Sequence, residues 1–421
     1  MATAIRTVAE VCESAKRASR GLVVASTEAK NAALSRLAEL LDARADEVLQ
    51  ANAEDLADER AADLTPALRD RLTLDEARVA AMADGVRAIA ALPDPVGEVL
   101  DERTLDSGLR LSKVRVPLGV IAVVYEARPN VTVDCAALTL KSGNAIVLRG
   151  SSYAARSNAA LAQLVREAVA DAGLPEAAVE LLTSGERAEL AELATADGLV
   201  DLIIPRGGEG LKEALKSVAT VPVMYAAAGN CHVYVHEDAD LEMARRIAFN
   251  AKVQRPGVCN AAEKLLVNAA VADEFLPGIL GDLRDAGVEL VGDDRTRTGA
   301  ADTQVGEANE ADWDTEYLDM RMAVGVVDSL DEAIDHVNRH GTGHSEAIIT
   351  SSDDAAREFT DGVDAAVVYV NASTRFTDGF EFGMGAEIGN STQKLHARGP
   401  IGLRELTTFK YVVHGDGQTR D

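Results

Sequence analysis

The sequence predicts an α/β fold with parallel sheets, preceded by helices and carrying a separate β hairpin. Beyond about residue 117, short apolar runs alternate with helical stretches, an order typical of parallel sheets covered by helices. Residues 1–92 are Ala-rich and charged, with apolar residues every three or four positions, as in amphipathic helices. Within them, residues 52–56 are interpreted as a solvated helix end rather than a binding loop. With 421 residues, 47% of them hydrophobic, the chain is long enough for two or three domains.

The hairpin is predicted after the helical part ends. Pro93-Asp94-Pro95 breaks the helical pattern. Residues 98–115 then alternate apolar and polar side chains around Asp106-Ser-Gly108, which is a hairpin signal. The strand-like run 406–414 is expected to pair with it. Such a sheet has an open edge, which favours pairing with another subunit.

Nine apolar runs are the candidate strands of the α/β part. Four precede residue 226 and five follow it, which predicts two α/β sets with ligands at the carboxyl ends of the parallel strands. Helical stretches such as 153–172 and 210–218 separate the strands of the first set. The runs are 119–125, 145–148, 179–182, 200–204, 232–235, 264–267, 323–327, 347–350 and 366–370.

Composition excludes several classes of partner. The chain has 42 Lys and Arg against 69 Asp and Glu, a net charge of −27, whereas a protein that binds nucleic acid needs a basic face. No apolar run has the length of a membrane span or a signal region. We therefore expect a cytoplasmic protein without nucleic-acid or membrane partners. No disulfide framework and no metal site is expected, because the four cysteines lie far apart, at Cys12, Cys135, Cys231 and Cys259.

Cys259 has neighbours that favour a reactive thiolate. Lys252 and Arg255 are close in sequence, Pro256-Gly257 forces a bend, and residues 260–264 are interpreted as the first turn of a helix or a tight crossover. Positive charge or backbone N–H groups lower the pKa of a thiol, and the thiolate is the nucleophile. The alternative is that Cys259 is a small buried apolar residue, as cysteines often are.

Two glycine-containing segments follow candidate strands and open helices. They are Arg149-Gly-Ser-Ser152 and Pro205-Arg-Gly-Gly-Glu-Gly210. The amino termini of helices offer N–H groups to anions, and glycine lets the backbone approach closely. Both segments are candidate phosphate loops, although neither matches G-x-G-x-x-G or a P-loop. Ordinary glycine turns between strand and helix are the alternative.

Four motifs then follow one another along the chain: VPLGVIAVVYEARPN at 116–130, LKSGN at 140–144, QRPGVCN at 254–260 and VNASTRFTDG at 370–379. Together they resemble the γ-glutamyl phosphate reductases, a family of the aldehyde dehydrogenase superfamily. The resemblance runs from about residue 10 to 415. It implies an oxidoreductase of L-proline biosynthesis that reduces L-glutamate 5-phosphate with NADPH to L-glutamate 5-semialdehyde and phosphate, with no metal.

The family fold implies an aldehyde dehydrogenase-like arrangement of three domains and a homo-oligomer. The resemblance also raises an association with glutamate 5-kinase, which makes the labile substrate. The implied domains are a Rossmann-type cofactor domain of residues 1–97, 117–226 and 391–405, an α/β catalytic domain of residues 227–390, and a β oligomerisation arm of residues 98–116 and 406–421.

Matched residue by residue, the resemblance also implies a site. Cys259 stands where the superfamily has its nucleophile, and Asn130 stands where it has the oxyanion-hole asparagine, whose amide pairs with the backbone N–H of Cys259. Arg128 and Arg255 are candidates for the phosphate or α-carboxylate of the substrate, with a structural salt bridge as the alternative. Arg149 suits a 2′-phosphate, which favours NADPH. The positions that match cofactor-binding residues are Arg149, Gly150, Ser151, Ser152, Gly207, Gly208, Gly210 and Glu316.

One departure from the superfamily pattern favours the reductive direction. Oxidising members place a Glu, the general base for water, shortly before the strand that precedes the thiol, whereas this chain has Ala226-Ala-Ala-Gly-Asn230. Two alternatives stay open: an oxidising, NAD-linked semialdehyde dehydrogenase, and a non-catalytic binding protein on the same fold. The missing Glu and Arg149 count against the first, and Cys259 with Asn130 counts against the second.

Overall fold

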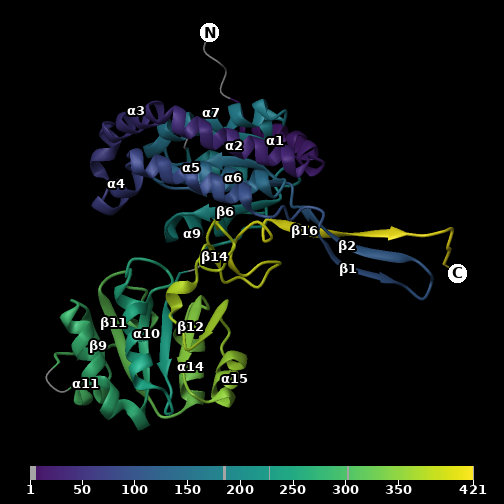
Figure 1. The fold of residues 1–421 in the computed structure, drawn as a ribbon. Helices are drawn as coiled ribbons and strands as arrows, with labels where there is room; N and C mark the ends of the chain where they lie inside the picture. Colours follow the sequence, from purple (N-terminus) through teal and green to yellow (C-terminus); the bar gives the residue numbers. More distant parts are fainter. Residues whose placement is uncertain (1–5, 184–185, 227, 301–302, 421) are drawn as a thin grey trace. The chain divides into compact units, whose positions relative to one another are not determined.

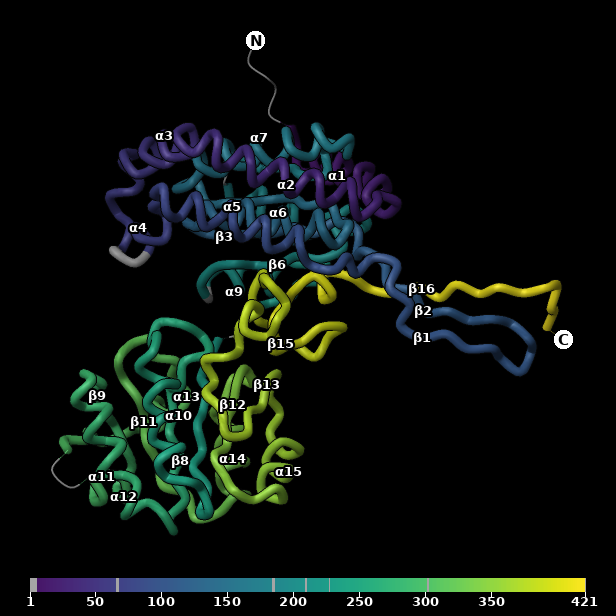
Figure 2. Tube along the Cα trace, viewed as in Figure 1, coloured from purple at the N-terminus to yellow at the C-terminus, as the bar shows by residue number. Residues whose placement is uncertain are grey.

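The computed structural model describes residues 6–183, 186–226, 228–300 and 303–420, shown in Figures 1 and 2. Contacts divide the chain into two compact units. Unit 1 comprises Met1–Tyr225, Gly383–Gly389 and Ile401–Asp421, and unit 2 comprises Ala226–Phe382 and Asn390–Pro400. Near the end of the chain this division differs from the expected domains, which assign residues 227–390 to one domain and 391–405 to the other. The functions assigned to the domains stay predictions.

The helical start of unit 1 is confirmed over the described residues. It consists of α1 (Val8–Val23), α2 (Thr27–Ala43), α3 (Ala45–Leu56), the 3₁₀ turn η1 (Glu59–Asp63), α4 (Pro66–Leu72) and α5 (Glu76–Ala91). Thr7 begins α1 with a capping box to Glu10, which satisfies N–H groups that the first turn leaves open. Residues 52–56 do form the end of α3, but this end is only partly solvated, because Asn52 and Asp55 are each 1% exposed.

Unit 1 contains a four-stranded parallel sheet, as the first set of apolar runs predicts. Its order is β5-β4-β3-β6, with parallel pairing throughout. Because the order reverses beside β3, the carboxyl ends of β3 and β6 form the switch point at which open α/β sheets bind ligands. The strands are β3 (Val120–Tyr125), β4 (Ala145–Arg149), β5 (Val179–Leu182) and β6 (Leu202–Arg206), and the helices and 3₁₀ turns are α6 (Asn130–Lys141), η2 (Ser152–Ala154), α7 (Ala155–Asp171), η3 (Glu176–Ala178), α8 (Arg187–Ala194) and α9 (Glu209–Val218).

The predicted hairpin and its distant partner strand form a three-stranded antiparallel arm. Strands β1 (Val99–Thr104) and β2 (Arg110–Pro117) pair with each other, and β16 (Thr407–His414) pairs with β2. Figure 1 shows the arm extending away from the helices of unit 1. Phe409, Tyr411 and Val413 are exposed on it. An arm with exposed apolar side chains and two open edges is suited to pairing with another surface.

Unit 2 is built on a seven-stranded sheet of order β10-β9-β11-β8-β7-β12-β13, in which every neighbouring pair is parallel. The five predicted runs are confirmed, and the two short strands at one end of the sheet, β10 and β9, were not predicted. The strands are β7 (Cys231–Val235), β8 (Ala262–Asn268), β9 (Glu289–Gly292), β10 (Gly306–Glu307), β11 (Arg321–Val327), β12 (Ser345–Ile349) and β13 (Val367–Val370).

The sheet of unit 2 is covered by helices, and its core gathers the buried faces of β7, β8 and β11 with α10 and α11. A second cluster, around Tyr234 and Phe359, joins it to α14 and α15. The remaining elements are α10 (Leu241–Val253), α11 (Ala269–Asp285), α12 (Asp294–Gly299), α13 (Glu310–Asp314), α14 (Leu330–His340), α15 (Asp353–Gly362), η4 (Thr374–Phe376), β14 (Asn390–Ser391) and β15 (Gly399–Pro400).

Candidate active site

Cys259 lies in the connection from α10 to β8, in unit 2. The helical interpretation of residues 260–264 is wrong, because β8 begins at Ala262 and pairs with β7 on one side and β11 on the other. Pairing on both edges overrides local helix propensity. Cys259 therefore lies at the amino end of its strand, whereas the sequence predicts site residues at the carboxyl ends.

Of the four cysteines, Cys259 is the accessible one. The other three are buried, and Cys259 is half-buried. Burial raises the pKa of Cys12 to about 11, that of Cys135 to about 12, and that of Cys231 well above its ordinary value. These three thiols stay protonated at neutral pH, so Cys259 is the one placed to act as a nucleophile.

The cations around Cys259 differ from those that the sequence indicates. Lys252 is fully buried, and its Nζ lies 2.8 Å from Oε2 of Glu263, so its charge is already balanced. Arg375, which follows β13, takes its place. Burial lowers the pKa of Arg375, the charge of Arg255 lowers it further, and the thiolate of Cys259 acts in the opposite direction. The guanidinium of Arg375 thus lies within electrostatic reach of both the Cys259 thiolate and Arg255.

The segment that carries Arg375 is clamped to the thiol loop. Nδ2 of Asn260 donates to the carbonyl of Thr377 over 2.9 Å, and Oγ1 of Thr374 donates to the carbonyl of Asn260 over 2.7 Å. Arg375 Nε also donates to Oε1 of Gln254 over 2.8 Å. The sequence motif of residues 370–379 predicts no role for Arg375. These contacts give that motif a physical task, because they hold a cation beside Cys259.

A second connection packs against the thiol loop from the start of β7. A Cβ added to Gly229 would fall on the carbonyl oxygen of Cys259, so only glycine allows the two backbones to approach this closely. The N–H of Gly229 donates to Oε1 of Glu316 over 2.6 Å. Glu316, predicted to bind a ribose, therefore lies in the same unit as Cys259 and beside the residues that precede β7.

The loop of Glu316 is held by two buried side chains of β8. Nζ of Lys264 donates to the carbonyl of Thr315 over 2.8 Å, and Oε1 of Glu263 accepts from the N–H of Leu318 over 3.1 Å. Leu318 has a φ of 53°, which is rare for a branched side chain. The hydrogen bonds of Lys264 and Glu263 keep the loop in this strained conformation and so fix the position of Glu316.

Unit 1 carries the other candidate residues. Asn130 begins α6 and donates from Nδ2 to Oδ2 of Asp134 over 2.9 Å. Burial raises the pKa of Asp134 to about 6, against the opposing effects of Asn130 and Arg206. Arg128, two residues earlier, is half-buried. Asn130 and Arg128 belong to unit 1, whereas Cys259 belongs to unit 2.

Arg149 ends β4 and is mostly enclosed, with its side chain 11% exposed. Its Nη2 donates to the carbonyl of Glu186 over 2.9 Å, and its Nε lies 3.5 Å from Oε2 of Glu189. Burial lowers the pKa of Arg149, and the carboxylate of Glu189 opposes that change. A phosphate group on this guanidinium would have to share it with Glu189.

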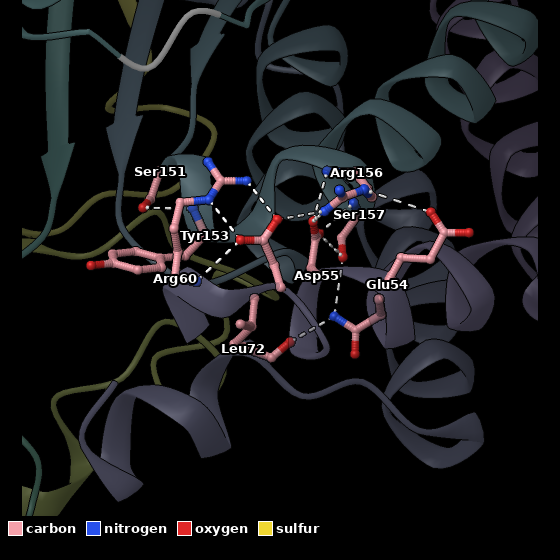
Figure 3. A network of polar contacts seen from close by, with 10 residues as sticks. Glu54, Asp55, Arg60, Leu72, Ser151, Tyr153, Arg156 and Ser157 are labelled. Carbon is pink, nitrogen blue, oxygen red and sulfur yellow. Dashed lines mark hydrogen bonds and ion pairs between the residues drawn. The ribbon is translucent and has the colours of Figure 1, made fainter. Parts of the chain in front are cut away.

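The amino terminus of α7 is already capped by a carboxylate. Oδ2 of Asp55 accepts from the N–H and the hydroxyl of Ser157 over 2.8 and 2.7 Å, and Oδ1 accepts from the N–H of Arg156 over 3.1 Å. Figure 3 shows this network joining α3 to the segment after Ser151. The expectation that this helix start offers open N–H groups to a phosphate is therefore wrong at residues 156 and 157, since an acidic side chain fills them.

The second candidate phosphate loop, after β6, is more open. The N–H of Gly208 donates to Oε2 of Glu126 over a longer 3.2 Å. Nothing lies within 4 Å of a Cβ added at Gly208 or Gly210, whereas one at Gly207 would press on Glu126 and Leu211. At Gly150 an added Cβ would collide with Asn158. Gly150 and Gly207 are thus required by internal packing, and Gly208 and Gly210 leave space in front of the loop.

These residues fit a nicotinamide dinucleotide. The cation of Arg149 and the open backbone at Gly208 and Gly210 stand at the carboxyl ends of β4 and β6, and they suit the anionic phosphates of such a molecule. In the described ranges, no three His, Cys, Asp or Glu side chains are grouped as metal ligands. The described helices are all too short or too polar to cross a membrane.

Known proteins closely match this chain. The model of the aldehyde dehydrogenase family matches residues 2–309 and 322–412. The chain is 54% identical over 415 residues to a gamma-glutamyl phosphate reductase of Thermobifida fusca, with 99% of each chain covered. The chain belongs to the γ-glutamyl phosphate reductase family of aldehyde dehydrogenases. A reductase of this family from Syntrophomonas wolfei is 53% identical over 406 residues, with 96% of each chain covered.

The solved structure of a γ-glutamyl phosphate reductase from Thermotoga maritima has the same fold. Its TM-score to this chain is 0.96 at 48% sequence identity, and the match covers 99% of this chain and 100% of the other. The aldehyde dehydrogenase-like fold and the family resemblance are thereby confirmed. Family membership also implies a nicotinamide cofactor. The roles of the individual site residues stay predictions of the family pattern.

Proposed function

We propose that this chain reduces L-glutamate 5-phosphate with NADPH to L-glutamate 5-semialdehyde and phosphate, the second step of L-proline biosynthesis from glutamate. The observation that carries the proposal is the environment of Cys259, the accessible thiol of the four: its charge acts on Arg375, whose segment is hydrogen-bonded to the thiol loop. Cationic groups favour the thiolate. The relatives that cover nearly the whole chain bear the name of this activity, which supports the assignment.

In the proposed mechanism the thiolate of Cys259 attacks the acyl carbon of the substrate. A bond forms from Sγ to this carbon, the bond to the phosphate oxygen breaks, and orthophosphate leaves with the electron pair. The side-chain amide of Asn130 donates to the oxyanion that develops; removing one such donor costs roughly 10²–10³ in rate. A nicotinamide cofactor, when bound, supplies hydride to the resulting thioester. Collapse of the thiohemiacetal then releases the aldehyde and restores the Cys259 thiolate.

The direction of the reaction follows from what is missing beside the thiol. Hydrolysis of a thioester needs a general base to activate water. The stretch from Ala226 to Asn230 contains no carboxylate. An acyl phosphate needs no such base, because phosphate is a good leaving group. This difference favours the phosphorylating, reductive enzyme over an oxidising, NAD-linked one.

The cofactor is proposed to be NADPH. A guanidinium pairs with a phosphate through charge-assisted hydrogen bonds, and Arg149 brings this group to the end of β4. Ser151 and Ser152 follow it, Gly207, Gly208 and Gly210 are assigned to the pyrophosphate, and Glu316 is assigned to the nicotinamide ribose. Arg128 and Arg255 are assigned to the anionic groups of the substrate.

The proposal extends to the setting of the enzyme. We expect a cytoplasmic homo-oligomer in which the arm of β1, β2 and β16 pairs with another copy, since its apolar side chains and edges are exposed. An association with glutamate 5-kinase would protect the labile acyl phosphate and is part of the same proposal.

One assay tests the function. The reverse reaction is followed as reduction of NADP with L-glutamate 5-semialdehyde, with and without orthophosphate. The proposed enzyme requires phosphate, because phosphate must cleave the thioester. Phosphate-independent oxidation would instead identify an oxidising dehydrogenase, and no oxidation in either mixture would identify a non-catalytic protein.

A further inference from the structure

A cavity of about 360 Å³ opens in unit 1 between α4, α5 and the start of α6. Charged side chains from all three elements line it, including Arg71, Arg78, Arg128 and Asp134, together with Asn130. Met82 and neighbouring apolar groups form the rest of the wall. A concave site with a few converging polar groups on an apolar wall is the usual form of a small-molecule site.

The arginines of this cavity differ in how their charge is balanced. Arg78 is paired: its Nη2 lies 2.8 Å from Oδ1 of Asp70, and its Nη1 donates to the carbonyl of Thr73 over 2.6 Å. Arg71 and Arg128 have no carboxylate within ion-pair distance among the residues that the structure describes. This is notable in a chain with 69 acidic and 42 basic residues, in which carboxylates are abundant.

A third arginine adds to the positive charge around Arg128. Burial, followed by the charges of Arg206 and Arg71, lowers the pKa of Arg128 to about 10, and the carboxylate of Glu126 acts in the opposite direction. Arg206 ends β6 and packs against the backbone of Gly389, where a Cβ would collide with its guanidinium. Within the described part of the chain, Arg206 also lacks an ion-pair partner. Holding three like charges together costs free energy unless an anion joins them.

We propose that Arg71, Arg128 and Arg206, here called the arginine cluster, bind an oxyanion of the substrate, either its carboxylate or its phosphate. Arg71 and Arg128 supply hydrogen bonds from the cavity wall, and Arg206 supplies the third positive charge. Guanidinium groups bind both kinds of oxyanion in a bidentate manner. The inference rests on the proposed function for the identity of the substrate, whereas the anion site rests on the arginine cluster itself.

The position of Asn130 on the same wall gives the site its place in the reaction. Asn130 is the proposed donor to the reacting carbonyl oxygen, and L-glutamate 5-phosphate carries one oxyanion on the reacting carbon and another at its far end. Either anion would hold the substrate so that its carbonyl lies near Asn130. Arg71, which no sequence motif indicated, thereby becomes a substrate-binding residue.

The kinetic test uses the reverse reaction and three variants of the full chain. Arg71→Gln is the main variant because Arg71 is exposed, and Arg128→Gln is the second. Arg17→Gln, on α1 with a side chain 69% exposed, is the control for loss of one positive charge. We expect Arg71→Gln and Arg128→Gln to raise the KM for orthophosphate or for the semialdehyde roughly ten- to hundredfold, as when charged hydrogen bonds are lost. A rise for orthophosphate identifies the phosphate, a rise for the semialdehyde identifies the carboxylate, and no rise for either in Arg71→Gln and Arg128→Gln overturns the proposal.

A binding measurement separates this inference from the proposed function. Thermal unfolding of the wild-type chain is followed with increasing orthophosphate and, separately, L-glutamate, without cofactor. A ligand of the native state raises Tm with concentration. The anion site stands if an anion raises the Tm of the wild type and of Arg17→Gln but not that of Arg71→Gln. If the same wild type lacks phosphate-dependent activity, the proposed function is wrong while the anion site stands. A rise that Arg71→Gln and Arg128→Gln both retain overturns the site. Arg71→Gln keeps the test valid if Arg128→Gln fails to fold.

Discussion

The side chain of Asn130 donates a hydrogen bond of 2.9 Å to Asp134, four residues later on α6. Burial raises the pKa of Asp134 to about 6, so the carboxyl group that orients the amide changes its charge near neutral pH. With a raised pKa, the native state holds the proton more tightly than the unfolded chain. The stabilisation from this group is thus full below its ordinary pKa of about 4 and is lost as the pH rises through 6.

Asp134→Asn should therefore become more stable relative to the wild type as the pH rises from about 4 to 7, because the wild type alone loses this stabilisation. Urea unfolding at several pH values in this range measures the difference. Asp354→Asn, at a side chain 94% exposed, is the control and should show no comparable trend. A constant difference between Asp134→Asn and the wild type across the range would contradict the raised pKa.

Cys259→Ser should abolish turnover and leave the fold intact, because a serine hydroxyl without an adjacent base is a poor nucleophile. Cys12→Ala and Cys135→Ala, at buried thiols, should retain most of the activity. Alkylation provides an independent measurement: one thiol per chain should react rapidly in the wild type and none in Cys259→Ser. Turnover that survives in Cys259→Ser would end the thioester mechanism.

Gly229→Ala should greatly reduce kcat, because the added Cβ would fall on the carbonyl of Cys259 and one of the two connections must move. Gly281→Ala, on α11 in the same unit, has open space around the new methyl group. It should leave the free energy of unfolding unchanged or raise it by up to about 1 kcal/mol, since alanine has a higher helix propensity than glycine. Steady-state kinetics and thermal unfolding of both variants make the comparison. Equal activity of the two would mean that the thiol loop adapts easily.

Arg149→Ala should raise the KM for NADPH by roughly one to two orders of magnitude and that for NADH much less, as expected if the guanidinium binds the 2′-phosphate. The neighbouring Glu189, 3.5 Å from Arg149, supplies a matched variant. Glu189→Gln removes the competing carboxylate and should lower the KM for NADPH. Measurements of kcat/KM with both cofactors decide the matter, and an equal fractional loss for NADPH and NADH in Arg149→Ala would remove Arg149 from the 2′-phosphate site.

Deletion of residues 408–421 should give smaller species in solution, because it removes most of β16 and exposes the edge of β2. The truncation keeps Leu406, which is fully buried and whose carbonyl accepts from Asn144. Light scattering measures the mass of the full-length and the truncated protein in solution. An unchanged mass would assign any oligomer to another surface.

Apolar runs were sufficient to predict most of the strands, because strands buried on both faces consist of nearly continuous apolar residues, as β3 does. The exceptions are β9 and β10, which have only four and two residues and too little apolar sequence to stand out. Hairpin and partner strand were also predictable, since alternation and a turn signal are local features.

Several site features could not be predicted, because they depend on partners that folding brings from far along the chain. Asp55 caps α7 from 102 positions before Ser157, so the helix start looked open in sequence. Arg375 reaches the thiol loop through contacts such as that of Thr377 with Asn260, 117 positions apart. The sequence places Lys252 near Cys259, but in the structure Lys252 forms an ion pair with Glu263 on the following strand. The motif resemblance was sufficient to find Cys259, whereas the ion pairs and hydrogen bonds of the charged residues around it could be identified only from the structure.

The arm also imposes an order of events during synthesis. Arg115 of β2 donates to Thr407 of β16 across 292 positions of sequence, and Figure 2 shows the C end of the trace close to the turn between β1 and β2. At about 5–20 residues per second, a ribosome needs roughly 15 to 60 s to make that interval. Throughout this time the nascent chain presents the hairpin without its third strand. Neighbouring chains on one polysome therefore have a window in which a strand from one could close the hairpin of another, and exchange of arms between copies would begin there.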